Sequence, residues 1–142
     1  MSATQGSSGF GTLLKRGDGA TSEVFTTVAE VKSISGPSLS METIDATHME
    51  SPSGFREWLP SFKDGGEVTF DLNFLPAVAA QTGLTTDFKN RTKRNWKIVW
   101  PNTGATKWSF AGYITGFTPS AAVGDILAAS CTIKVTGDVV IS

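Results

Sequence analysis

The stretch Glu67-Val68-Thr69-Phe70-Asp71-Leu72-Asn73-Phe74 contains the clearest structural pattern in this chain. Apolar side chains occupy every second position, and acidic or small polar groups lie between them. Because successive side chains of a β-strand point to opposite faces, this alternation predicts a strand with one face in a core and the other in water. The polar face carries no cation. We therefore expect a fold built on a sheet with one solvated face.

Weaker β patterns precede this strand. Residues 23–34 carry β-branched and aromatic side chains among polar ones, and Ser35-Gly36-Pro37 should end that strand. The next run, residues 38–48, is the expected hairpin partner of residues 67–74. Its apolar residues change parity partway along, from Leu39 and Met41 to Ile44 and Ala46. That change predicts a β-bulge near Glu42 and Thr43.

A helix and further strands are expected after residue 74. Pro76 suits the first turn of a helix, and residues 77–93 lack strand alternation, although Gly83 weakens the middle. Strand patterns follow at residues 96–100, 107–117, 126–136 and 139–141. The sequence thus predicts a single, mainly β domain over residues 1–142. Its expected form is a β-sandwich or partial barrel of six or seven strands with one flanking α-helix.

Two segments lie outside this pattern. Residues 1–18 are rich in Gly, Ser and Thr, which predicts a flexible N-terminal arm, with residues 2–11 disordered in the free subunit and no part in the core. Residues 50–66 form a long, aperiodic, aromatic-rich segment that we interpret as an assembly loop. The alternative is that this loop folds back over the core. Interface candidates within it are Phe55, Arg56, Glu57, Trp58, Phe62 and Lys63.

Composition excludes several function classes. The only histidine is His48 and the only cysteine is Cys131, so we expect no catalytic triad, no metal site and no cofactor. The net charge of −1 offers no positive field for nucleic acid or membrane binding. No export signal or membrane-spanning run is visible, and a reducing cytoplasm suits the single thiol. Only 18% of residues are charged, which favours burial against partners.

One basic cluster admits two interpretations. Five cations are interleaved with Phe88 and Trp96, as in surfaces that bind single-stranded nucleic acid: Lys89, Arg91, Lys93, Arg94 and Lys97. The favoured interpretation is structural, because cations late in a helix complement its dipole and the rest of the chain offers no matching positive surface.

Several ordered segments resemble the tail tube proteins of lambda-like siphophages. They are Ser35–His48, Ser51–Trp58, Pro60–Glu67, Leu72–Phe74, Arg94–Ile98, Trp108–Phe117 and Thr132–Gly137. Each segment is short, but they occur in family order, and the resemblance extends over roughly residues 24–141. Some family members carry an additional immunoglobulin-like domain, and none is expected here.

The resemblance implies a non-enzymatic structural subunit. Six copies would close into a ring, and stacked rings would form the tube of a long non-contractile tail, located in the virion and assembled in the host bacterial cytoplasm. The implied partners are further copies of the chain, a tape measure protein, other tail assembly proteins, and phage DNA that passes through without sequence-specific binding. A phage-derived particle, such as a gene transfer agent or a tailocin, could use the same subunit.

The inner wall of such a tube should be acidic or neutral, because fixed cations would bind sliding DNA at many points. The candidates for this lumen surface are Glu42, Asp45, Glu67 and Asp71, with Glu42 or Asp45 beside Asp71 on the expected hairpin. A different class of function stays open: a monomeric β-sandwich that binds a ligand or carbohydrate on Trp58, Trp100 or Trp108.

Overall fold

The computed structural model describes residues 3, 4, 6 and 8–142 of the chain. Among these residues the chain forms nine β-strands, one α-helix and one 3₁₀ turn. The strands are β1 Leu13–Gly17, β2 Phe25–Thr27, β3 Val31–Ser35, β4 Ser40–Asp45, β5 Trp58–Asp64, β6 Glu67–Asn73, β7 Arg94–Val99, β8 Lys107–Ser120 and β9 Ala128–Ile141. The helix α1 spans Ala79–Asn90, and the 3₁₀ turn spans Pro52–Gly54.

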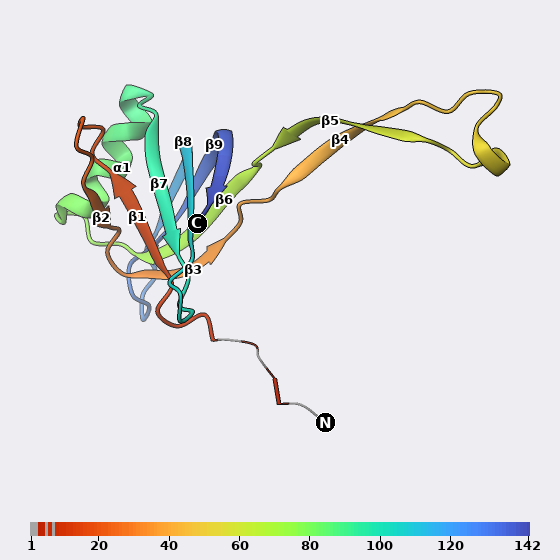
Figure 1. The fold of residues 1–142 in the computed structure, drawn as a ribbon. Coiled ribbons are helices and arrows are strands. Elements are labelled where there is room, and N and C mark those ends of the chain that lie inside the picture. The colour runs from red at the N-terminus through yellow and green to blue at the C-terminus, as the bar shows by residue number, and fades with distance from the viewer. Residues whose placement is uncertain (1–2, 5, 7) are drawn as a thin grey trace.

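Seven strands form one antiparallel sheet in the order β2-β1-β7-β8-β9-β6-β3. The sheet curls, so that β1 near one end contacts β3 at the other (Figure 1). The backbone N–H of Val28 donates to the carbonyl of Leu14 at 2.9 Å and extends the pairing of β1 with β2 by one residue. The expected partial barrel with one helix is therefore confirmed, as a single curved sheet.

The core lies on the concave face of this sheet. Val68, Phe70 and Leu72 of β6 are at most 1% exposed, as the alternation in the sequence predicts. Their register partners on β9 are Ile133, Cys131 and Ala129, which are also buried. Trp96 of β7 is fully buried and is the largest side chain of the core. Burial of the thiol of Cys131 raises its pKa to about 12.

Helix α1 contributes one face to the core through Gln81, Leu84 and Asp87. Gln81 is buried but satisfied: its side-chain amide donates to the carbonyls of Ala29 and Asn73, and its oxygen accepts from the Leu75 N–H at 2.7 Å. The helix ends where Arg91 adopts a left-handed conformation, with φ of 55°. It is shorter than the expected 77–93.

A buried carboxylate anchors α1 to the sheet. Asp87 is 1% exposed and accepts two hydrogen bonds from Arg16 of β1, at 2.6 and 2.9 Å. It also accepts one from Arg94 of β7 at 3.0 Å. Arg94 in turn donates to the carbonyl of Asp18 at 2.8 Å. Pairing with two guanidinium groups compensates for the cost of burying the carboxylate.

The N-terminal expectation needs correction. Residues 13–17 are a strand of the main sheet rather than part of an arm, because Leu14 fills the core at 0% exposure and Arg16 pairs with Asp87. Residues 3, 4, 6 and 8–11 are in no strand or helix. Residues 1, 2, 5 and 7 of the expected arm lie outside the described residues, so its disorder stays a prediction.

Two further strand boundaries differ from expectation. The run 23–34 divides into β2 and β3, since Glu30 has a φ of 52° and turns the chain between them. The runs 126–136 and 139–141 are one strand, β9, because Gly137, with φ of 79°, bends the chain without ending it.

Candidate functional site

The most distinctive feature is a two-stranded arm that projects from the body of the molecule (Figure 1). Strands β4 and β5 pair only with each other, and every residue of β4 is exposed. This corrects two expectations. Much of the segment 50–66 is a strand rather than a loop, and the hairpin partner of residues 38–48 is β5 instead of β6. Strand β6 lies between β9 and β3.

The register slips near Glu42 and Thr43 as expected, but the bulge expected within residues 38–48 is wrong, because the extra residue lies in the opposite strand. Met41 pairs with Lys63 whereas Thr43 pairs with Pro60, so the register slips between them. Glu42 therefore faces two residues of β5. Strand β4 itself keeps its alternation, which places apolar side chains on both of its faces.

Cross-strand partners share a face, so the register assigns each apolar residue of the arm to one side. Ile44 and Leu59 pair directly, and Phe62 follows on their side. Met41 and Trp58 lie on the opposite side. Trp58 is 54% exposed and Phe62 is 81% exposed. The arm thus presents two apolar faces that the described part of the chain leaves uncovered, a pattern that marks an interaction surface.

Polar contacts hold the tip of the arm. Glu57 accepts a hydrogen bond from the Ser51 hydroxyl at 2.7 Å, and its carboxylate lies 3.3 Å from Nε2 of His48. Arg56 donates to Asp45 at 3.0 Å across the hairpin. The hydrogen bonds from Thr47, followed by the one from Arg56, hold the pKa of the Asp45 carboxyl below its usual value. These contacts order a tip that has no core beneath it.

The predicted interface residues Phe55, Arg56, Glu57, Trp58, Phe62 and Lys63 all lie on this arm. They divide into two groups. Arg56 and Glu57 make polar contacts within the tip, with Asp45 and with Ser51 respectively, whereas Phe55, Trp58, Phe62 and Lys63 remain exposed. Their role in assembly stays a prediction.

The predicted lumen residues are not brought together. Glu42 and Asp45 lie on the arm, whereas Glu67 and Asp71 lie on the solvated face of β6. The hypothesis that Glu42 or Asp45 lies beside Asp71 is wrong, because β6 is flanked by β9 and β3. Asp45 is paired with Arg56 instead.

Small hydroxyl groups surround Asp71 on the solvated face. Its carboxylate accepts hydrogen bonds from Ser130 of β9 at 2.5 Å and from Ser33 of β3 at 3.1 Å. These bonds, Ser130 first, together with the nearby charge of Lys32, hold its pKa below the usual value. Asp71 therefore remains ionised at neutral pH. At the arm end of the same strand, Glu67 lies opposite Lys134.

Other sequence candidates have internal roles. Of the basic cluster, Arg94 pairs with Asp87, and Lys97 lies 4.1 Å from the centre of the Phe25 ring. Trp100 and Trp108 pack edge to face on each other at 5.9 Å. The described residues contain no cluster of three metal-ligating side chains, and none of their helices could cross a membrane.

A comparison with protein families finds a match over residues 14–142 to the model of the lambda phage tail tube protein, TTP. The chain belongs to the lambda phage tail tube protein family. The match covers nearly the whole chain, in agreement with the resemblance found in its sequence segments. No curated protein sequence matches the chain.

Solved structures share the fold of this tail tube family member at low sequence identity. The tail of an empty gene transfer agent (GTA) particle, determined with C6 symmetry, has a TM-score of 0.75 at 19% identity and covers 92% of this chain and 95% of its own. The SPP1 tail tube has a TM-score of 0.65 at 15% identity, and the match covers 90% of this chain and 73% of the SPP1 chain. A chain of the anti-feeding prophage baseplate has a TM-score of 0.70 at 11% identity, and the match covers 100% of this chain and 97% of the baseplate chain.

Sequence reasoning missed two apolar residues on the arm of this tail tube family member: Met41 and Ile44, which are 53% and 54% exposed. The signal was present in β4. Apolar groups of both parities in one strand indicate either a bulge or a strand with two apolar faces, and β4 is the second of these.

Proposed function

We propose that this chain is a structural tail tube subunit without enzymatic activity. Six copies close into a ring, and stacked rings form the DNA-conducting tube of a long, non-contractile phage tail. The observation that carries the proposal is the arm: in a member of the tail tube family, two uncovered apolar faces extend away from the body and require a partner. Further copies of the same chain supply it.

The arm explains how identical subunits hold together. It projects from one side of the body and is too narrow to bury its own apolar groups. An arm that lies on a neighbouring subunit makes a head-to-tail contact, which propagates into rings or open tubes instead of closed dimers. Strands β2 and β3 are the edges of the main sheet, and pairing with neighbouring copies would cover them.

Symmetry and tail type rest on different observations. The C6 symmetry of the similar gene transfer agent tail supports six copies per ring. The lambda family model supports a non-contractile tail, although similar structures also come from contractile injection systems. The proposed location is the virion tail, after assembly in the host cytoplasm, with a tape measure protein and other tail assembly proteins as partners.

The solvated face of β6 is the proposed lumen wall. Asp71 provides a fixed negative charge there, and the hydroxyl groups of Ser33 and Ser130 surround it. Lys134, the cross-strand partner of Glu67, and Lys32, near Asp71, are cations close to this face. Glu67 and Asp71 offset these two charges, so this surface has no net positive charge to hold DNA phosphates, and the genome can slide. The helix α1 and its following basic residues lie at another part of the molecule, next to β1 and β7.

Electron microscopy of concentrated purified protein tests the assembly proposal. We expect negative stain to show rings or tubes of constant width. A monomeric ligand-binding module would instead give small particles without further order at every concentration, and that result would reject the proposal. Of the three candidate rings for such a module, Trp100 and Trp108 are half-buried and pack edge to face on each other, whereas Trp58 is 54% exposed.

A further inference from the structure

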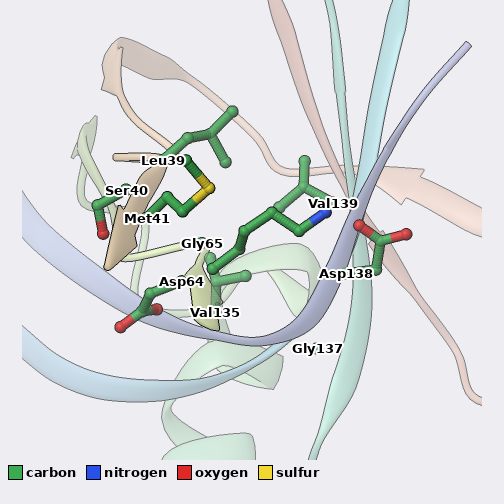
Figure 2. Close-up of a pocket in the computed structure, with 10 residues that line it drawn as sticks. Leu39, Ser40, Met41, Asp64, Gly65, Val135, Gly137, Asp138 and Val139 are labelled. Carbon is green, nitrogen blue, oxygen red and sulfur yellow. The ribbon is translucent and has the colours of Figure 1, made fainter. Parts of the chain in front are cut away.

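A pocket of about 680 Å³ lies where the arm joins the body (Figure 2). Leu39 and Met41 of the arm form one wall, and Val135 and Val139 of β9 form the other. At the base of the pocket the backbone of Gly65 packs directly against Val135, so closely that a side chain on Gly65 would collide with it. Leu39 and Met41 are each 53% exposed. The pocket is therefore a preformed, partly apolar site that no described residue fills.

An apolar projection lies on the turn between β8 and β9. The N–H of Asp125 donates to the carbonyl of Ala122 at 3.1 Å, which closes a turn with Val123 and Gly124 at its tip. Gly124 has a φ of 88°, a conformation that side chains rarely adopt. Val123 is fully exposed, and Ile126 is 64% exposed. A tight turn usually presents polar residues, so this one is unusual.

The pocket and the turn lie at opposite ends of the ladder between β6 and β9. Glu67 pairs with Lys134 beside the pocket, whereas Asn73 pairs with Ala128 beside the turn. At about 3.3 Å per residue, positions 127 and 135 are roughly 25 Å apart. One copy cannot insert its own turn into its own pocket. Complementary surfaces at opposite ends of a subunit join copies head to tail.

The charges at these two surfaces permit one ion pair. The pocket lining carries one cation, Lys63, and two carboxylates, Asp64 and Asp138, of which Asp64 already accepts a hydrogen bond from the Gly66 N–H at 2.9 Å. Lys63 lines the pocket and forms no ion pair with any described residue. Asp125 is exposed beside Val123 and likewise has no cationic partner among those residues. We propose that the β8–β9 turn of one subunit inserts Val123 into the arm-base pocket of the next subunit, where Asp125 pairs with Lys63. This inference rests on the proposed tube assembly and places a contact at the base of the arm, where Met41 ends one of its apolar faces.

Cysteine cross-linking tests this contact. In tubes of a double variant, Met41→Cys with Val123→Cys, oxidation should link successive copies into a ladder of dimers, trimers and longer chains on a denaturing gel. Each single variant should give at most dimers. Both positions are exposed, so the fold should tolerate the changes. Cys131 adds no background, since it is buried and its thiol has a pKa of about 12.

Charge reversal provides an independent readout. Lys63→Asp or Asp125→Lys alone should raise the critical concentration for tube formation roughly fivefold, as expected for replacing an ion pair by like charges. Combining the two charge reversals should restore the critical concentration to within about twofold of the wild-type value. The matched control, Lys107→Asp, lies outside the pocket and should change little.

The outcomes separate the two proposals. Tubes of the double cysteine variant that form normally but give no ladder would overturn the pocket contact and leave tube assembly intact. The same conclusion would follow if the double charge reversal raised the critical concentration as much as the single reversals do. Wild-type protein that never forms tubes would instead reject the proposed function on which this contact depends.

Discussion

Replacing Trp58 by alanine is expected to leave the isolated subunit folded and to raise the critical concentration for tube formation by roughly thirtyfold. Trp58 lies on the arm, is 54% exposed, and makes no contribution to the buried core. Truncating an exposed side chain usually changes the free energy of unfolding by less than about 0.5 kcal/mol. As an interface anchor, the same tryptophan contributes about 2 kcal/mol or more. Light scattering and thermal unfolding measure the two effects separately.

The matched control is Trp96→Ala, which removes the same side chain from the core. Trp96 is fully buried, so its loss should cost about 3–5 kcal/mol of folding free energy. If Trp58→Ala lowers the thermal stability of the monomer as much as Trp96→Ala does and leaves tube formation unchanged, the arm is a structural part of the subunit and its assigned role is wrong.

Asp71→Lys is expected to permit tube assembly but to slow or block genome ejection. The substitution changes the charge by two units per subunit on the proposed lumen face, at a position whose native carboxylate is ionised at neutral pH. Cations repeated around every ring would bind DNA phosphates along the whole tube. The delay should be largest at low ionic strength, where the Debye length is longest. The measurement is the time course of DNA release from particles that carry the variant.

Two further variants separate charge from position. Asp71→Asn removes the charge but keeps a hydrogen-bonding group for Ser33 and Ser130, so it should eject nearly normally. Glu42→Lys makes the same charge change on the arm, away from the β6 face, and should have little effect on ejection rate. Wild-type ejection kinetics for Asp71→Lys at low salt would show that this face does not line the passage.

The sequence predicted β6 well because that strand satisfies both local and global requirements. Its alternation reports directly on one buried and one wet face, and Val68, Phe70 and Leu72 are buried as expected. The helix was expected instead from Pro76 and from the lack of strand alternation over residues 77–93. The strands that follow it were found for the same reason as β6. Each buries a periodic set of side chains in one core.

The arm could not be derived in this way. Strands that lack a buried face have no pattern that reveals their pairing, and Pro60 in the middle of β5 further obscured it. Such a residue is tolerated because the arm is only two strands wide. The aromatic content of residues 50–66 nevertheless marked the segment as a candidate interface, since the composition of an interface does not depend on its secondary structure.

Strand β1 was missed for a different reason. Its short sequence, Leu13-Leu14-Lys15-Arg16-Gly17, follows a Gly- and Ser-rich segment and has no alternation of its own. The position of β1 in the sheet is set by residues far away in the sequence, because Leu14 pairs with Ile98 and Arg16 binds Asp87 on the helix. Contacts between residues so far apart in the sequence leave no local signal.

A cryo-electron microscopy reconstruction of tubes grown from the purified chain tests the central claim most directly. The account predicts six subunits per ring, with the arm of each subunit lying against a neighbouring copy so that Trp58 and Phe62 become buried, and with Asp71 facing the central passage. A tube in which the arms extend into solvent, or in which Asp71 lies on the outer surface, would contradict it.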